Sequence, residues 1–360
     1  MSQFEKIMKE EIAEINEALT EFITWKKDEA SHMGPTHQQY YDNILEYIMR
    51  GGKRLRPMAM VVAHKAVKKD IEVKHLYRAA CSLEILHNGS LLHDDLIDHD
   101  ETRRGGPTFH ARYREWYKEQ FDARKEKADD FGMTLAILGG DSLINLGAEA
   151  INHSELDPSI AMKLLDYYQK GFSDLVEGVL LEMSMITLPD VGEDTYLEMV
   201  YRKTATLFQK ALQMGATIAG ASNAQLEAFS EFGAKVGQAF QMQDDILGSF
   251  GDESVTGKSS AGDIREAKKT MLLIQALKRS TSEQKKVLED LLGKADMSDD
   301  EVEEVRIVFR DSGALEATEK IRDDLLKQAQ DALKTTNPPL DSKYLSFLID
   351  LSEFLTSRAF

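Results

Sequence analysis

Apolar residues recur every three or four positions along most of the chain, which is the spacing of one face of an α-helix. Most of the seven prolines fall where such stretches start or stop, and no alternation of apolar and polar residues predicts a sheet. No internal repeat is visible. The pattern predicts an all-α fold with helices at 4–29, 36–50, 57–69, 73–98, 131–153, 157–181, 193–221, 223–249, 265–280 and 341–358.

Two charged stretches interrupt the apolar pattern, Glu115–Asp130 and Ser298–Glu304. Neither has the composition of a flexible linker. Although 360 residues would ordinarily suggest two domains, we expect residues 1–360 to form one domain. We interpret the first stretch as an exposed insert, with a helical hairpin as the simplest form.

Composition excludes several classes of protein. The net charge of −18 argues against a nucleic-acid binder, but local basic residues can still hold an anionic ligand. The single cysteine, Cys81, excludes an internal disulfide framework and lies in an apolar stretch typical of a helix core. We expect a cytoplasmic protein, because no signal peptide or membrane span is evident.

Two pairs of adjacent aspartates stand out, each inside a predicted helix. Asp94 and Asp95 are followed by Asp98, and the second pair is Asp244 and Asp245. Residues four apart share a helix face, so Asp94 and Asp98 should project together. Like charges this close favour a bound cation, and hard carboxylate oxygens suit Mg²⁺, which keeps positions for water and phosphate. Two such clusters facing each other would hold a diphosphate.

Basic residues accompany the first acidic cluster. Lys53 and Arg56 belong to a Gly-Gly-initiated turn that can grip phosphate, or form only a solvated basic turn. His87 lies two turns before Asp94 and should share its face, which favours a ligand contact over a structural histidine. Arg103 and Arg104 precede Gly-Gly-Pro, which indicates a shaped loop rather than a charged helix end.

Polar residues also accompany the second acidic cluster, Asp244 and Asp245. Lys203 and Thr204 lie in an apolar helical stretch, where a lysine normally extends to the surface, and Gln241 precedes Asp244 by three residues. Lys258 and Lys268 follow the cluster and could neutralise a departing diphosphate.

In this ordered set of motifs the chain resembles the trans-isoprenyl diphosphate synthases, also called polyprenyl synthetases. The matching segments are GGKRLRP at 51–57, HNGSLLHDDLID at 87–98, RRGGPT at 103–108, KTA at 203–205, FQMQDD at 240–245, GK at 257–258 and DIREAKKT at 263–270. The resemblance implies a single bundle of long helices around a deep central cavity, assembled as a homodimer. It also implies Mg²⁺-dependent condensation of isopentenyl diphosphate with an allylic diphosphate (dimethylallyl, geranyl or farnesyl), with three Mg²⁺ ions expected.

Residue by residue, the resemblance assigns two binding sites. The metal ligands on the two sides of the allylic diphosphate are Asp94, Asp95, Asp98, Asp244 and Asp245. Residues matching contacts to that diphosphate are Arg103, Lys203, Gln241, Lys258 and Lys268, and Thr204 and Gln241 match positions that stabilise the developing cation. The isopentenyl diphosphate site corresponds to Lys53, Arg56, His87 and Arg104.

Three positions depart from the family pattern. The second acidic motif usually ends in a third aspartate, where this chain has Gly248, with Asp252 one turn further on. The family's GQxxD segment is Gly178 to Glu182 here, without the glutamine and with a longer acid. Ala267 replaces a glycine or asparagine. None of the three is expected to remove an essential charge.

Product length is expected to depend on the helix before Asp94. Gly89 and Ser90 lie about one turn deeper than Asp94, where family members with short products often carry an aromatic residue. Because both are small, the growing tail should pass that level and reach Ile85 and Leu86, giving twenty carbons (geranylgeranyl) or more.

Two other functions share part of this pattern. A non-catalytic regulatory subunit of a heteromeric synthase is favoured only by Gly248. A class I terpene cyclase shares the acidic helix, but it has no second diphosphate to bind and so no use for the basic turn and His87.

Overall fold

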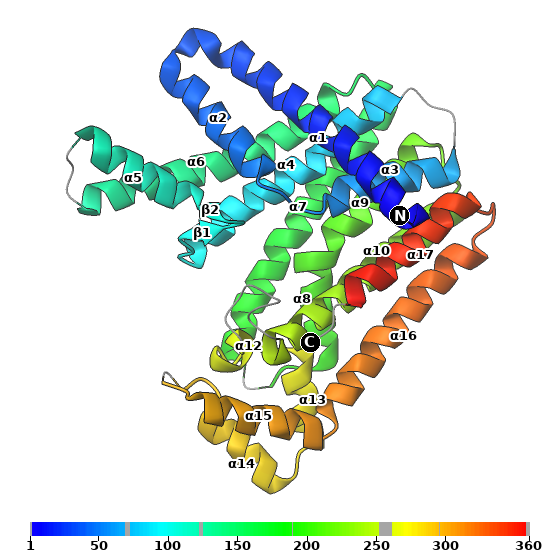
Figure 1. Ribbon diagram of the computed structural model, residues 1–360. Coiled ribbons are helices and arrows are strands. Elements are labelled where there is room, and N and C mark those ends of the chain that lie inside the picture. Colours follow the sequence, from blue (N-terminus) through cyan, green and yellow to red (C-terminus); the bar gives the residue numbers. More distant parts are fainter. Residues whose placement is uncertain are drawn as a thin grey trace. The chain divides into compact units, whose positions relative to one another are not determined.

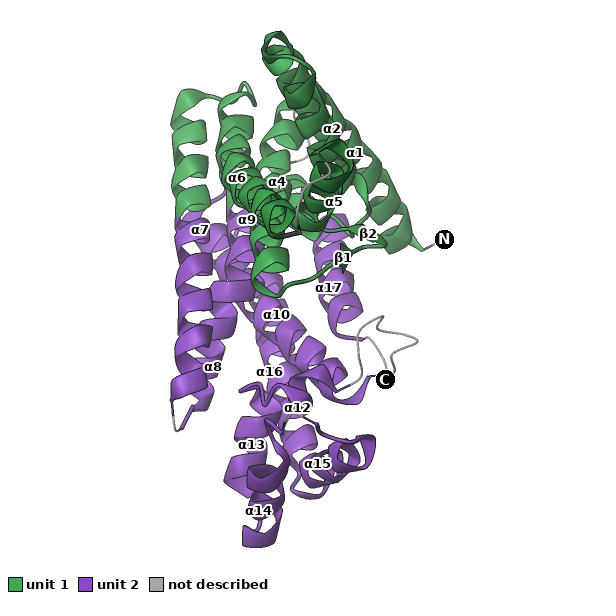
Figure 2. Cartoon of the chain, turned by 90° about the vertical axis from the view of Figure 1, so that its left-hand side faces the viewer, with its two compact units in different colours: residues 1–169, 214–220 green, residues 170–213, 221–360 purple. Residues whose placement is uncertain are grey.

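The structure is a computed structural model that describes residues 2–68, 73–121, 125–188, 190–251, 261–294 and 296–357. These residues are almost entirely helical, which confirms the all-α prediction. They divide into two compact units (Figure 2): unit 1 comprises residues 1–169 and 214–220, and unit 2 comprises residues 170–213 and 221–360. The single domain expected from composition stays a prediction.

Unit 1 is a group of helices with one small β-ribbon. Antiparallel α1 and α2 lie side by side and are joined by the short helix η1 (Figure 1). The bounds are α1 Gln3–Glu29, η1 Ala30–Met33, α2 Pro35–Met49, α3 Leu55–Val67, α4 Val73–Ile97, β1 Thr102–Arg103, β2 Gly106–Pro107, α5 Phe109–Phe121, α6 Lys125–Asn152 and the first part of α7, Pro158–Thr187. Cys81 is fully buried in α4, as expected.

Helix α6 packs against both α4 and α5, and glycines permit the close approach. A Cβ at Gly147 would come 2.7 Å from the carbonyl oxygen of Ser82 in α4. A Cβ at Gly132 would come 3.2 Å from the backbone nitrogen of Arg114 in α5 and would overlap the carbonyl oxygen of His110. Within the charged stretch predicted as an exposed insert, residues 115–121 end α5 and residues 125–130 begin α6. Figure 1 shows these two helices lying together.

The same helix contains a long apolar stretch. An 18-residue window within Glu126–Asn152 has a mean hydropathy of 1.2, enough by length and composition to cross a membrane. A core helix passes the same test, and α6 packs along α4 and α5. The absence of a membrane span therefore stays a prediction.

Unit 2 contains the rest of α7 and the helices that carry the second acidic pair. Helices α10 and α16 lie side by side along much of their length (Figure 1). The bounds are α8 Glu193–Val200, η2 Tyr201–Ala205, α9 Thr206–Ile218 (whose last residues, from Met214, belong to unit 1), α10 Asn223–Phe250, α12 Gly262–Arg265, α13 Met271–Arg279, α14 Ser282–Leu291, α15 Asp299–Asp311, α16 Ala314–Thr335 and α17 Ser342–Thr356.

The structure corrects several predicted elements. The helix expected at 265–280 is interrupted before α13, because Ala267 adopts a left-handed conformation (φ 51°) and Thr270 caps the new helix. The apolar pattern also missed α14, α15 and α16, and the charged stretch at 298–304 lies mostly in α15. The β1–β2 ribbon was not predicted; its strands pair Thr102 with Pro107 and Arg103 with Gly106.

The helix predicted at 193–221 is interrupted by a π-helical turn, η2, which contains Lys203 and Thr204. Two glycines bring neighbouring helices against this turn. A Cβ at Gly178 of α7 would come 2.8 Å from the Cα of Lys203, and a Cβ at Gly237 of α10 would come 2.5 Å from the Cα of Ala205. Isolated π turns often occur at functional sites. The altered GQxxD segment therefore keeps its first residue, Gly178, because a side chain there would meet the backbone of the π turn.

Replacing Gly178 with alanine should lower the free energy of unfolding by about 1–3 kcal/mol, because the new methyl group meets backbone atoms that cannot move aside. The matched control is Gly171→Ala on the same helix. There the new Cβ would come 3.2 Å from the side chains of Leu207 and Lys210, which can adjust. The control should be neutral or stabilising, as alanine is the better helix former. Urea unfolding of the two variants checks this, and equal effects would contradict the packing argument.

Candidate active site

The first acidic cluster lies at the end of α4 in unit 1. Asp98 still donates its backbone N–H to the carbonyl oxygen of Asp94 at 2.8 Å, so the two residues lie one turn apart as predicted. Asp98 is exposed and Asp94 is half-buried, whereas Asp95 is completely buried. The three aspartates therefore differ in their access to a ligand.

Asp95 is held by two protein donors. The Tyr47 hydroxyl donates to its Oδ2 at 2.7 Å, and the Arg103 guanidinium donates to its Oδ1. Burial raises the pKa of Asp95, while Tyr47 and Arg103 oppose that shift. The geometry therefore lets Asp95 position Arg103, and the carboxylates of Asp94 and Asp98 are more accessible than that of Asp95. The assignment of all three as metal ligands stays a prediction. Tyr47 was not identified from the sequence, where nothing distinguishes it from an ordinary core residue.

The paired arginines lie on the β1–β2 ribbon. Arg104 and Gly105 both have positive φ angles, 50° and 75°, as a two-residue type I′ turn requires. From this turn Arg104 donates to the carbonyl oxygen of Gly51 at 2.9 Å. Arg50 donates to the carbonyl oxygen of Pro107 at 2.6 Å from the same side. The predicted shaped loop is present, and the hydrogen bond from Arg104 to Gly51 holds it against the Gly51–Gly52 turn.

The basic turn before α3 is not simply solvated. Arg54 is 3% exposed and forms a buried ion pair with Glu84 at 2.6 Å, so it serves the fold. Arg56 is half-buried, and its Nε is a buried donor with no partner among the described residues. A buried N–H without an acceptor is costly, so this donor fits an anion. Lys53 is half-buried beside it in the sequence.

His87 lies in this basic environment. Burial, and then the positive charges of Arg56 and Arg104, lower the pKa of His87 well below its usual value. The ring is therefore neutral at physiological pH, with one nitrogen able to donate a hydrogen bond. Lys53, Arg56, His87 and Arg104 together form what we call the basic set of unit 1.

The residues expected to control product length differ in their burial and in the groups that they contact. Ile85 and Leu86 are fully buried, and Ser90 is nearly buried and donates its hydroxyl to the carbonyl oxygen of His87 at 2.8 Å. Gly89 faces α6, where a Cβ would come 3.0 Å from the Cβ of Leu143. A side chain at position 89 would therefore press on α6. The assignment of Gly89 and Ser90 to product length stays a prediction.

The second acidic pair lies on α10 in unit 2, and its second aspartate is again the buried one. The Tyr196 hydroxyl donates to Oδ2 of Asp245 at 2.6 Å, and the Gln241 amide donates to Oδ1 at 2.9 Å. Thr204, on the π turn, donates its hydroxyl to Oε1 of Gln241 at 2.9 Å. Asp244 is more exposed than Asp245. Thr204, Gln241 and Asp245 thus form one hydrogen-bonded chain.

Two of the predicted lysines lie beside this chain. Lys203 forms an ion pair with Glu182, the longer acid of the altered GQxxD segment. The Nζ of Lys268 is 3.9 Å from Oδ1 of Asp245 and 3.6 Å from Oδ1 of Asp263. Burial disfavours its charge, but Asp245 and Asp263 outweigh burial and raise the pKa of Lys268.

Burial raises the pKa of Asp245 to about 6; Lys268 opposes this shift and Asp263 adds to it. The carboxyl is thus ionised at pH 8 and largely protonated at pH 5. Lys258 and Asp252 lie outside the described residues.

The donors fit Mg²⁺ better than a metal that needs a complete protein cage. Among the residues that the structure describes, no three His, Cys, Asp or Glu side chains form a ready metal site. Mg²⁺ is usually held by one or two carboxylates, water and substrate phosphate. The accessible carboxylates of Asp94, Asp98 and Asp244 match that requirement.

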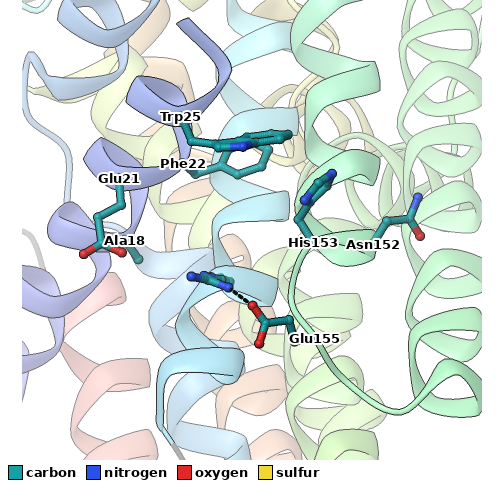
Figure 3. A pocket seen from close by; sticks show the side chains of 8 residues that line it. Ala18, Glu21, Phe22, Trp25, Asn152, His153 and Glu155 are labelled. Carbon is teal, nitrogen blue, oxygen red and sulfur yellow. Dashed lines mark hydrogen bonds and ion pairs between the residues drawn. The ribbon is translucent and has the colours of Figure 1, made fainter. Parts of the chain in front are cut away.

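A surface depression elsewhere in unit 1 does not belong to this site. It lies between α1, α4 and the end of α6, and Trp25, Arg78 and Glu155 are among its lining residues (Figure 3). Arg78 and Glu155 form an ion pair at 2.6 Å across it. None of the predicted site residues lines this depression.

Helices that carry paired aspartates beside cations are typical of enzymes that bind Mg²⁺ and a phosphate ester. The family model described as polyprenyl synthetase matches residues 38–308. The chain belongs to the polyprenyl synthetase family and is an all-α prenyltransferase.

Two of its relatives span most or nearly all of the chain. A geranylgeranyl diphosphate synthase from Methanosarcina mazei is 31% identical over 86% of this chain and 87% of its own. A geranylgeranyl diphosphate synthase from Sulfolobus acidocaldarius is 30% identical over 98% of both. The crystal structure of geranylgeranyl pyrophosphate synthase from Corynebacterium glutamicum, complexed with isoprenyl diphosphate and magnesium, has a TM-score of 0.85 and 27% identity, covering 96% of this chain and 98% of that one.

Replacing Tyr196 with phenylalanine should destabilise the metal-free protein at pH 8 by about 1.5–3 kcal/mol, the range for a hydrogen bond to a charged group. The control is Tyr201→Phe, which removes a bond to the neutral Oε1 of Gln209 at 2.9 Å and should cost about 0.5–1.5 kcal/mol. Urea unfolding measures both.

The destabilisation caused by Tyr196→Phe should also depend on pH in a known direction. Because the folded-state pKa of Asp245 lies above its ordinary value, Asp245 favours folding most when protonated, and its contribution is lost as pH rises through about 6. Tyr196→Phe should therefore cost less at pH 5 than at pH 8. A pH-independent effect would show that Tyr196 does not support an ionised carboxylate.

Proposed function

We propose that this protein condenses isopentenyl diphosphate head-to-tail with an allylic diphosphate, dimethylallyl, geranyl or farnesyl, to give a trans-polyprenyl diphosphate. The observation that carries the proposal is the basic set of unit 1, in which Arg56 has a buried donor without a partner among the described residues. A terpene cyclase has no second diphosphate for such a set. The two relatives above are named for geranylgeranyl diphosphate, a twenty-carbon product, which supports a product of twenty carbons or more.

The acidic residues serve the allylic diphosphate in this proposal. Asp94, Asp98 and Asp244 supply carboxylate oxygens for Mg²⁺, with three ions expected from the family resemblance. Asp95 and Asp245 hold neighbouring donors in place, since both of their oxygens already accept protein hydrogen bonds. Arg103, Lys203 and Lys268 add positive charge for the leaving group, and Lys258 is assigned the same role by its motif alone.

The chemistry needs no protein nucleophile. Bound Mg²⁺ supplies Lewis-acid stabilisation of the departing diphosphate. Arg103 and Lys268 are preorganised by Asp95 and Asp245, so they can stabilise that developing charge without reorganising. Thr204 and Gln241, which are joined by a hydrogen bond, are assigned the role of stabilising the allylic cation by their motifs. The isopentenyl double bond attacks this cation, and the departed diphosphate takes up the proton that is then lost.

We propose that the enzyme acts as a cytoplasmic homodimer. Along the unit 2 part of α7, four large apolar side chains at helical spacing are exposed: Val176 at 41%, Leu180 at 61%, Met183 at 56% and Ile186 at 66%. This α7 stripe has no covering element among the described residues. An exposed apolar stripe of this kind is typical of a surface that packs against another chain.

Because the α7 stripe is proposed as the dimer interface, introducing charged residues into it should dissociate the dimer. Leu180→Glu combined with Met183→Glu should shift the mass in solution from about twice 40.5 kDa to 40.5 kDa. The control is Ile307→Glu, at an isolated exposed position on α15 that is 46% exposed, and it should leave the mass unchanged. Light scattering after size exclusion measures the mass. A wild-type monomer would refute the homodimer.

The activity is tested with purified protein, labelled isopentenyl diphosphate, each allylic primer and Mg²⁺. We expect products of twenty carbons or more, abolished by chelation and reduced at least about a hundredfold by Asp94→Ala, because a carboxylate ligand is lost. Asp129→Ala, at an exposed acid of α6, is the control and should keep activity. Mainly fifteen-carbon products would contradict the expected length. No product with any primer from folded protein would favour the regulatory subunit.

A further inference from the structure

Arg54 anchors the basic turn before α3 to three other helices. Its guanidinium donates to Oδ1 of Asn16 in α1 at 2.9 Å, to the carbonyl oxygen of Ile48 in α2 at 2.8 Å, and to Oε1 of Glu84 in α4 at 2.6 Å. All four residues belong to unit 1, and Arg54 is 3% exposed. Because all three of its side-chain nitrogens already donate to protein acceptors, Arg54 is a cross-link between helices and not a phosphate ligand.

The backbone of Arg54 is also unusual. Its φ angle is 49°, after Gly51 and Gly52 at 109° and 125°. Glycine adopts such angles freely, whereas a non-glycine residue keeps a positive φ only where its surroundings hold it. The carbonyl oxygen of Arg54 accepts a hydrogen bond from the N–H of Met58 at 3.0 Å and so closes the first turn of α3. The side-chain contacts of Arg54 therefore fix the point at which α3 begins, and with it the members of the basic set on either side.

The carboxylate of Glu84 is held from its own helix. Glu84 is 3% exposed, and the Asn88 amide, one turn further along α4, donates to its Oε1 at 3.3 Å. Burial lowers the pKa of Arg56 and of Arg104, and the negative charge of Glu84 opposes both shifts. One acid therefore binds the anchor of the turn and also acts on two cations of the basic set.

We propose that Arg54 and Glu84 are positioning residues for isopentenyl diphosphate, an inference that rests on the proposed function. Their ion pair holds the basic turn so that the basic set can bind one diphosphate, and neither residue contacts that ligand. The residues assigned to the allylic diphosphate belong to other motifs. Loss of the pair should therefore weaken binding of isopentenyl diphosphate and leave the allylic substrate largely unaffected.

A second buried acid in unit 1 provides a matched control. Glu11 is 5% exposed and accepts hydrogen bonds at 2.6 Å from both the Lys65 ammonium and the Tyr77 hydroxyl. None of these three residues belongs to the basic set. Glu11→Gln and Glu84→Gln therefore make the same change, in the same unit and at similar burial. A role in stability alone predicts the same effect from both.

The sign of the effect separates positioning from charge. Glu84→Gln removes a negative charge close to the basic set, which by itself should tighten the binding of an anion. Lost positioning of the turn should weaken that binding instead. Asn16→Ala leaves every charge in place and removes only one of the three bonds of Arg54, so it tests positioning alone.

The readouts are calorimetric binding of isopentenyl diphosphate and steady-state kinetics with each substrate varied. Glu84→Gln should raise Kd and KM for isopentenyl diphosphate about tenfold or more, because a small displacement of binding groups has a large effect. The KM for the allylic primer and kcat should stay within about twofold of wild type. Glu11→Gln should keep wild-type constants for both substrates, while urea unfolding shows a similar loss of stability in the two variants.

Asn16→Ala is the milder variant and keeps the ion pair of Arg54 with Glu84. It should raise KM for isopentenyl diphosphate about threefold, the size of one hydrogen bond. This variant decides the question if Glu84→Gln does not fold.

Wild-type or tighter binding of isopentenyl diphosphate by folded Glu84→Gln, or by Asn16→Ala in its place, would overturn the inference. An equal rise of KM in Glu11→Gln would do the same, because the pair would then have only a general role in stability. In each case the proposed function stands if the wild type binds isopentenyl diphosphate and forms product. A wild type that does neither overturns the proposed function as well.

Discussion

The hydrogen bond from a tyrosine hydroxyl to a buried aspartate is the interaction on which the acidic helix of each unit depends. Tyr47 binds Asp95 in unit 1, and Tyr196 binds Asp245 in unit 2. Burying a carboxylate is costly unless its oxygens accept hydrogen bonds, so each tyrosine stabilises its aspartate in the buried position. The preceding aspartate is then left on the more accessible side. The two acidic helices thus follow the same arrangement without any visible sequence repeat.

The buried aspartates also organise the cations. Asp95 holds Arg103 and Asp245 lies beside Lys268, while the neighbouring Gln241 connects Asp245 to Thr204 on the π turn. In water these long side chains would sample many conformations, and ordering them costs entropy. The contacts formed during folding offset this entropy cost before a ligand binds. In each unit the cation beside the buried aspartate is therefore already ordered in the ligand-free protein.

The sequence predicted the fold class and the helices with strong apolar periodicity. It failed for α14 and α15, whose exposed faces are highly charged, although the capping boxes Thr281 with Gln284 and Ser298 with Glu301 were local signals for their starts. The π turn was not predictable from periodicity, because it depends on Gly178 and Gly237 in other helices.

The site divides in the same way. Motif residues such as Asp94, Arg56 and Gln241 were named from spacing and resemblance. Their partners Tyr47, Tyr196 and Glu182 were not, because the pairings join residues 21 to 49 positions apart and carry no local pattern. Gly89 was assigned to an open floor because the sequence shows that a residue is small, but not which neighbour requires it. The structure shows that α6 is that neighbour.

The π turn at Tyr201–Ala205 has a consequence for how this chain can vary. A π turn contains one residue more than the α-helical turn it replaces, so it is in effect a single-residue insertion. Removing that residue would restore a regular helix but rotate the residues before the turn by about 100° relative to the residues after it. Tyr196, which precedes the turn, would then turn away from Asp245. The length of this segment is therefore constrained as strictly as the identity of its residues, and gaps should be tolerated in the loops around it but not within it.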